Sequence, residues 1–306
     1  MPEKKNHSAI AGGLLLTTIL WGGNNAGTKW LVSTGKWPPV FTGGTRFLCA
    51  GLLLLAVLRF TKLLGRFEQV SRAEFRSLWL RGGLSLAAYV VVFCWAFKLT
   101  AASHVALYLG ASPVWALLWE GKPRNVWEGI RRYGAALLAL SGVFVLFWPA
   151  FKEDATNPNG ELLGLLASFL WANYSHQARQ LSTRINSLEV AASSMWMAGL
   201  TLLPFALMEL GDGLQVDGQH LGVQTFCILL GSVVPYALWN TALRHWQTSR
   251  VLLFNNLIPL TTILWVHFTL DETISPTFLT AMGLIVAGVL LGQMDWAKIF
   301  REPESY

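Results

Sequence analysis

Charged residues are scarce in this sequence, and their scarcity excludes most soluble proteins. They make up 13% of the 306 residues, whereas 53% are hydrophobic. Soluble globular domains carry roughly 25% charged residues, so a soluble enzyme, a disordered protein and a nucleic-acid binder are excluded. The net charge of +6 forms no basic stripe on a polar face, and we attribute it to the flanks of membrane segments.

Cysteine is also rare, which excludes a disulfide framework. Cys49, Cys94 and Cys227 lie inside apolar stretches, and their odd number and wide spacing fit neither disulfides nor a zinc pattern. We interpret them as small side chains that fill the interior. We therefore expect neither a metal site nor a cofactor.

The apolar residues are gathered into ten blocks of membrane-spanning length, about 20 residues each. Their bounds are 9–32, 40–58, 78–97, 102–119, 133–149, 160–178, 188–208, 221–243, 250–270 and 275–294. Only helices and closed barrels satisfy the backbone hydrogen bonds in lipid, and barrel strands alternate apolar with polar residues. These blocks are continuous apolar runs. The sequence therefore predicts an all-α membrane protein with ten transmembrane helices.

The distribution of lysine and arginine predicts the orientation. If the N-terminus is inside, most basic residues fall on the inner connections. The outer side then holds Lys29, Lys36, Lys98 and Lys152. This bias satisfies the positive-inside rule. We expect a multi-pass protein of the inner (plasma) membrane, with the tails 1–8 and 295–306 both cytoplasmic.

The chain contains an internal repeat of five predicted helices. The first copy covers 9–149 and the second 160–294. The aligned pairs include Pro113 with Pro259, Leu118 with Leu264, and Trp119 with Trp265. Because five is odd, the second copy enters the membrane from the opposite side. Many secondary transporters use such an inverted repeat to build a central site with alternating access.

Several motifs resemble a known repeat. Residues 20–29 (LWGGNNAGTK), the pair Pro38-Pro39 and residues 46–50 (RFLCA) look like the opening of an EamA-type repeat. The stretch from Ser249 to the acidic pair Asp271-Glu272 resembles its fourth helix and the following turn. Through their order and duplication, the chain resembles the ten-helix EamA-type permeases of the drug/metabolite transporter (DMT) superfamily.

This resemblance implies an exporter or permease for amino acids, other metabolites or drugs, and it names no substrate. The second copy departs from the pattern, because residues 188–208 contain no arginine that corresponds to Arg46. The two halves are therefore not interchangeable.

Polar and aromatic residues inside the predicted helices are the candidates for a substrate site, because polar groups are costly in lipid and tend to face a bundle interior or a wet cavity. The candidates are Trp21, Asn24, Asn25, Tyr89, His104, Tyr108, Trp171, Tyr174, Trp239, Asn240, Asn255 and Asn256. The alternative interpretation is that many of them form interhelical hydrogen bonds or interface aromatics.

Two matched prolines are the candidates for gating. Pro113 and Pro259 cannot donate a hydrogen bond and crowd the carbonyls of Leu109 and Asn255. Each freed carbonyl needs a partner from a neighbouring helix, water or substrate. Kinks at symmetric positions suit helices that bend when a gate opens, and a purely structural kink is the alternative.

Charged groups within the predicted helices narrow the mechanism. No acidic residue lies at the centre of a span, since Glu120, Glu161 and Glu189 lie at span ends. The buried carboxylate that a proton-coupled cation antiporter generally uses is therefore missing, which favours a neutral or zwitterionic substrate. Arg46 lies deep in a span, and we favour a structural anchor over a substrate clamp.

Together these features predict an alternating-access exporter of amino acids or related amphipathic solutes, with the lipid bilayer and a small molecule as its partners. The alternative is a multidrug efflux permease on the same fold. An intramembrane enzyme would need acid clusters or a His/Asp/Cys constellation, and neither is found. The small-residue spacing of Gly288 and Gly292 permits a homodimer.

Overall fold

The structure, a computed structural model, describes residues 7–60, 70–116, 119, 123, 125–148, 157–246, 248–270 and 274–293. All regular structure in these ranges is helical. Residues 1–6 of the predicted N-terminal tail, the whole predicted tail 295–306, Glu120 and the pair Asp271-Glu272 lie outside the described residues. Each of the predicted apolar segments contains described helical residues.

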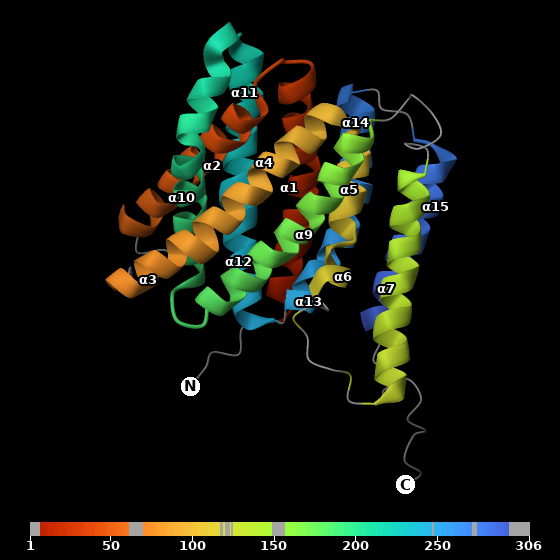
Figure 1. The fold of residues 1–306 in the computed structure, drawn as a ribbon. Helices are drawn as coiled ribbons and strands as arrows, with labels where there is room; N and C mark the ends of the chain where they lie inside the picture. Colours follow the sequence, from red (N-terminus) through yellow and green to blue (C-terminus); the bar gives the residue numbers. More distant parts are fainter. Residues whose placement is uncertain are drawn as a thin grey trace.

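The first half begins with three long helical stretches and ends with a broken helix and a fifth helix (Figure 1). Its elements are α1 (His7–Ser33), α2 (Pro39–Phe60), α3 (Arg72–Ser77), the π-helical turn η2 (Leu78–Gly83), α4 (Leu84–Leu99), α5 (Ala102–Gly110), α6 (Ser112–Ala116) and α7 (Val126–Phe147). The stretch from Arg72 to Leu99 is continuous.

The second half has the same plan. Its elements are α9 (Pro158–Leu181), α10 (Ser187–Met208), η3 (Glu209–Asp212), α11 (Gly218–Ile228), the π-helical turn η4 (Leu229–Val233), α12 (Val234–His245), α13 (Thr248–Leu252), η5 (Leu253–Leu257), α14 (Ile258–Leu270) and α15 (Pro276–Gln293). In both halves the third stretch contains a π-helical turn and the fourth is interrupted next to the matched proline. The repeat is thus present in the backbone as well as in the sequence.

Polar residues at the connections start the helices. Asn157 accepts a hydrogen bond from the backbone of Asn159 and is followed by Pro158 at the start of α9, where proline is favoured. Asp217 caps α11 by accepting from the backbone of His220. Backbone and side-chain hydrogen bonds from His220 hold the pKa of the Asp217 carboxyl below its usual range.

Four described helices are apolar and long enough to cross a membrane by length and composition. They are Pro39–Phe60, Arg72–Leu99, Ser187–Gly211 and Gly218–His245. Figure 1 shows the connection from α1 to α2 at the upper end of the bundle, and the connection from α9 to α10 at the lower end. The first two helices of one half therefore run in the opposite direction to the first two helices of the other (Figure 1).

The two halves pack most closely where α2 crosses α10. A Cβ atom on Gly51 would lie 2.2 Å from the backbone nitrogen of Trp196, and one on Gly199 would lie 2.4 Å from that of Leu48. Helix backbones that approach so closely leave no room for a side chain, as is common where membrane helices meet at small residues. Glycine is therefore required at both positions.

Helices α7 and α15 form a separate pair at one side of the bundle (Figure 1). A small apolar cluster that includes Val143, Phe278 and Ile285 joins the pair to α5. The homodimer predicted through Gly288 and Gly292 of α15 stays a prediction.

Candidate functional site

A buried polar face on α1 begins the site. Trp21, Asn24, Asn25 and Thr28 are all buried, and their spacing places them along the interior side of the helix. Helix α1 packs against α4 in the first half and against α12 and α14 in the second. The face therefore lies between the two halves.

Side chains from both halves surround a small cavity next to this face. Its lining residues are Trp21, Asn24, Asn25, Arg46, Tyr89, Phe93, Leu109, Trp171, Gly231, Tyr236 and Ile258. The cavity volume is about 20 Å³, enough for one water molecule and far too small for an amino acid. Trp21, Asn24, Asn25, Tyr89 and Trp171 are predicted site residues that the structure brings together here.

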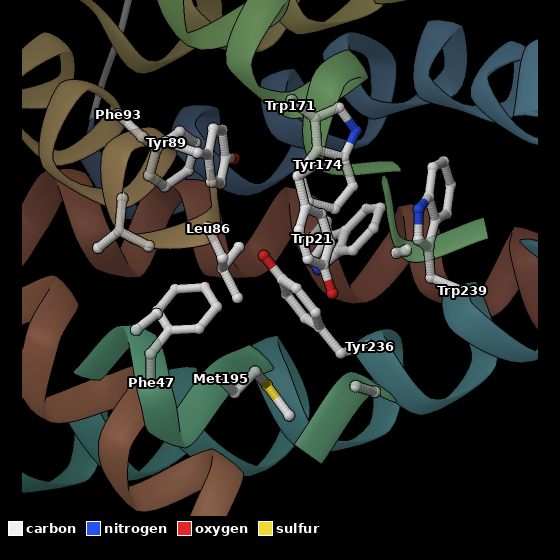
Figure 2. Packing of buried hydrophobic residues seen from close by; sticks show 14 of the residues in the cluster. Trp21, Phe47, Leu86, Tyr89, Phe93, Trp171, Tyr174, Met195, Tyr236 and Trp239 are labelled. Carbon is white, nitrogen blue, oxygen red and sulfur yellow. The ribbon is translucent and has the colours of Figure 1, made fainter. Parts of the chain in front are cut away.

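Aromatic rings that pack edge-on or at tilted angles (Figure 2) form one wall of the cavity. The ring centroid of Trp21 lies 5.2 Å from that of Trp171 and 4.9 Å from that of Trp239. Tyr89 lies 5.1 Å from Trp171, and Tyr236 lies 5.9 Å from Trp21. Aromatic faces carry partial negative charge and attract both apolar groups and cations. This wall suits a ligand that has an apolar part or an ammonium group.

Arg46 of α2 places a positive charge at the cavity. Its side chain is buried, and Nη1 donates to Asn24 Oδ1 at 2.7 Å and to Thr28 Oγ1 at 3.0 Å. Its guanidinium carbon lies 4.6 Å from the centre of the Phe47 ring. Within the described part of the chain, Nε of Arg46 has no hydrogen-bond partner and no carboxylate forms a salt bridge with the guanidinium.

These two bonds join α2 to α1, as expected of an anchor, but they leave the positive charge without an anion among the described residues. An anchoring arginine satisfies backbone carbonyls or extends to the membrane surface, whereas Arg46 bonds two neutral side-chain oxygens. A buried cation without an anion is costly in low dielectric. An anionic group at the cavity would relieve that cost.

Several predicted residues bond neighbouring helices, and Asn25 does so while it also lines the cavity. Asn25 Nδ2 donates to Thr262 Oγ1 at 3.0 Å, and Asn255 Nδ2 donates to Ser112 Oγ at 2.7 Å. Asn240 Nδ2 donates to Tyr174 Oη of α9 at 3.4 Å, and also to the carbonyl of Tyr236 within α12 at 3.0 Å. The interhelical interpretation therefore fits the geometry of Asn240 and Asn255. Trp239, Tyr174 and Asn256 are buried beside them.

The helix breaks at the matched prolines lie against the cavity. In the first half the helix is interrupted at Ala111, before Pro113. In the second half, the carbonyl of Asn255 accepts from the backbone of Ile258 in a 3₁₀ turn, just before Pro259. Leu109 and Ile258 both line the cavity. A role of the prolines in gating stays a prediction.

Glu161 forms a second polar site that sequence reasoning missed. This residue of α9 is fully buried. Tyr108 Oη donates to Glu161 Oε2 at 2.7 Å, His104 Nδ1 lies 2.9 Å from Oε1, and the hydroxyl of Thr100 donates to Oε1. We call Glu161, Thr100, His104 and Tyr108 the Glu161 cluster. His104 and Tyr108, predicted for the substrate site, lie in this cluster and are not among the residues that line the cavity, and a role in substrate binding stays a prediction.

A signal for this cluster was present. His104 and Tyr108 lie four residues apart, on one face of a helix, so they can bind the same group. Their partner Glu161 lies on a distant segment, at the end of a predicted span. The buried neighbours of Glu161 were not visible from the local sequence.

Comparison with known proteins places both halves in one family. The sequence profile of the EamA-like transporter family matches residues 9–148 and again residues 158–292. The chain belongs to the EamA-like transporter family. Each half of this EamA-like chain is thus one copy of the family domain, and the internal repeat is a duplication of that domain.

Relatives of this EamA-like protein cover nearly its whole length. An uncharacterised transporter of Archaeoglobus fulgidus is 25% identical over 94% of this chain and 97% of its own. A probable amino-acid metabolite efflux pump of Salmonella typhimurium is 25% identical over 90% of this chain and 92% of its own. A protein with the same description from Escherichia coli is 23% identical over 93% of this chain and 95% of its own.

A solved crystal structure has the same fold. It is 19% identical, covers 97% of this chain and all of its own, and has a TM-score of 0.67. Family and relatives indicate a membrane transporter rather than an enzyme.

Proposed function

We propose that this EamA-like protein is a secondary transporter of the inner membrane that exports amino acids or related amphipathic solutes by alternating access. The observation that carries the proposal is the buried Arg46 guanidinium beside an aromatic wall, without an anionic partner among the described residues. A substrate carboxylate supplies the missing negative charge and accepts hydrogen bonds from the guanidinium. The rings of Trp21 and Trp171 receive the ammonium group or an apolar side chain.

The arrangement of the two halves supports alternating access. In this proposal ten helices cross the membrane as two inverted five-helix repeats, with both termini in the cytoplasm. The opposite directions of the first two helices in the two halves support it (Figure 1), as does the positive-inside rule. Because the cavity is too small for an amino acid, the halves must move apart to admit one. Bending at Pro113 and Pro259 provides that movement.

The alternative, a multidrug efflux permease, receives support from the aromatic wall, since aromatic rings bind lipophilic cations. Arg46 opposes it, because a buried positive charge repels a cation in low dielectric. The charge at the cavity therefore favours a carboxylate-bearing solute.

Counterflow in proteoliposomes tests the proposal. Purified protein loaded with unlabelled phenylalanine or leucine is expected to exchange it for labelled amino acid outside, in a saturable manner. Phenylalaninamide has the same side chain and ammonium group without the carboxylate, and we expect it to compete at least tenfold more weakly. Saturable exchange of tetraphenylphosphonium, without exchange of any amino acid, would contradict the proposal and establish the alternative.

A further inference from the structure

The carboxylate of Glu161 is fully buried, whereas its histidine partner is partly exposed. Glu161 lies in the first turn of α9 and its side chain is 0% exposed, whereas the side chain of His104 is 16% exposed. The N-terminus of a helix favours a negative charge, and three donors hold the carboxylate. A carboxylate that only joined two helices would need no titratable donor. Here the partly exposed partner is an imidazole.

Few other charges face this pair in the described structure. Tyr108 and His104 approach it from α5. Lys29 of α1 lies near the pair through the backbone of Thr100: its Nζ donates to the carbonyls of Thr100 at 2.7 Å and Phe97 at 2.9 Å. The ring of Phe278 of α15 stacks on His104, with 6.4 Å between centroids. At the end of α4, Lys98 is exposed and lies over the Trp95 ring.

The pair can therefore hold a variable number of protons. With a neutral imidazole, the carboxylate and imidazole together carry one negative charge. One proton taken from water converts the imidazole to imidazolium and makes the pair neutral, with no bond other than N–H formed. Imidazole titrates within the physiological range, and in such close pairs the proton belongs to the pair rather than to one residue.

The same helices connect this pair to the cavity. Tyr108 binds Glu161, and the next residue, Leu109, lines the cavity. The break at Ala111 follows directly. Helix α9 carries Glu161 near its start and the cavity residue Trp171 further along. A Cβ atom on Gly164 would lie 2.5 Å from Cδ2 of Tyr108, so α5 and α9 are in direct contact.

A change of charge on the pair thus changes how firmly α5 is held to α9, and with it the wall of the cavity. We propose that Glu161 and His104 form the proton-binding site that couples export of the substrate to entry of a proton. This inference rests on the proposed transport function. It replaces the expectation that a buried carboxylate is missing from the protein.

Two transport assays on the same proteoliposomes separate binding from coupling. Counterflow at equal pH needs only substrate exchange, whereas accumulation driven by a pH gradient also needs the proton site. For Glu161→Gln we expect counterflow within about twofold of the wild type and gradient-driven accumulation reduced at least tenfold. His104→Gln keeps a hydrogen-bond donor but cannot titrate, and we expect the same loss.

The matched control is Glu189→Gln. Glu189 is another buried acid in the first turn of a helix, α10, and we expect both assays to be unchanged. Gradient-driven accumulation by Glu161→Gln at the wild-type level would overturn the proton site. Failure of the wild type to exchange any amino acid would instead overturn the proposed transport function.

A titration of the wild type keeps the inference testable if the variants fold poorly. The protein is labelled with nitrogen-15 in its histidine rings and studied by NMR. The ring resonance that disappears in His104→Gln is the resonance of His104. We expect this resonance to change with pH over the range in which the wild type accumulates substrate, and the change to differ in Glu161→Gln. A His104 resonance that stays constant over this range would overturn the inference without any measurement of transport.

Discussion

Replacement of Arg46 by glutamine is expected to reduce the transport efficiency for amino acids about 100-fold, which corresponds to ~3 kcal/mol. Glutamine can still bond Asn24 and Thr28 but cannot neutralise a carboxylate. Arg46→Lys keeps the positive charge but loses the planar guanidinium that can donate two parallel hydrogen bonds to a carboxylate, so we expect an intermediate effect. The measurement is counterflow at several phenylalanine concentrations, normalised to the amount of folded protein.

The carboxylate-free analogue identifies the cause of that loss. In the wild type, phenylalanine should compete better than phenylalaninamide, and in Arg46→Gln the two should compete equally. If Arg46 only anchored helices, the variant would unfold at a lower temperature and each folded molecule would still prefer phenylalanine. That preference in Arg46→Gln would contradict the role proposed for the guanidinium.

Replacement of Gly51 by alanine is expected to lower the free energy of unfolding by about 1–3 kcal/mol, because the new methyl group overlaps the backbone of α10. Its position would be 2.2 Å from the nitrogen of Trp196, and backbone cannot rotate away as a side chain can. Gly199→Ala should have a similar effect. The measurement is thermal or denaturant unfolding of purified protein in detergent.

The control for this prediction is Gly222→Ala in α11. A Cβ atom at Gly222 meets nothing within 4 Å, and alanine favours a helix over glycine, so the stability should stay the same or rise. Equal stability of Gly51→Ala and Gly222→Ala would show that α2 and α10 do not pack as closely as described. The double variant Gly51→Ala/Gly199→Ala is expected to be non-additive, because both changes affect one contact.

The helical fold could be predicted because its signal is local. A continuous apolar run needs no knowledge of its neighbours to indicate a helix, and a proline indicates a break. The π-helical turns η2 and η4 have no such signal. In η2, a Cβ atom on Gly82 would lie 2.4 Å from Ser194 Oγ of α10, so this turn accommodates a contact between segments far apart in the sequence.

The candidate site could be predicted only in part, for a related reason. Trp21 and Asn24 are exceptional within an apolar run, and this pointed to the interior. Phe93, Leu109 and Ile258 line the same cavity, but apolar residues look alike in the sequence whether they face a cavity or the core. The position of Glu161 depends on α5, which lies more than fifty residues earlier.

The most direct test of the central claim is whether one cavity can be reached from both faces of the membrane. Leu109→Cys introduces a thiol at the cavity wall, in a background where the exposed Cys49 is alanine. The same background without the change at Leu109 is the control. The exposed residues Thr183 and Val216, each changed to cysteine, mark the inner and outer faces.

In right-side-out and inside-out vesicles, an impermeant thiol reagent should label Val216→Cys and Thr183→Cys from opposite faces. We expect it to label Leu109→Cys from both faces, and saturating phenylalanine to protect this thiol from both. Labelling of Leu109→Cys from one face only, or labelling that phenylalanine leaves unchanged, would contradict a central substrate site with alternating access.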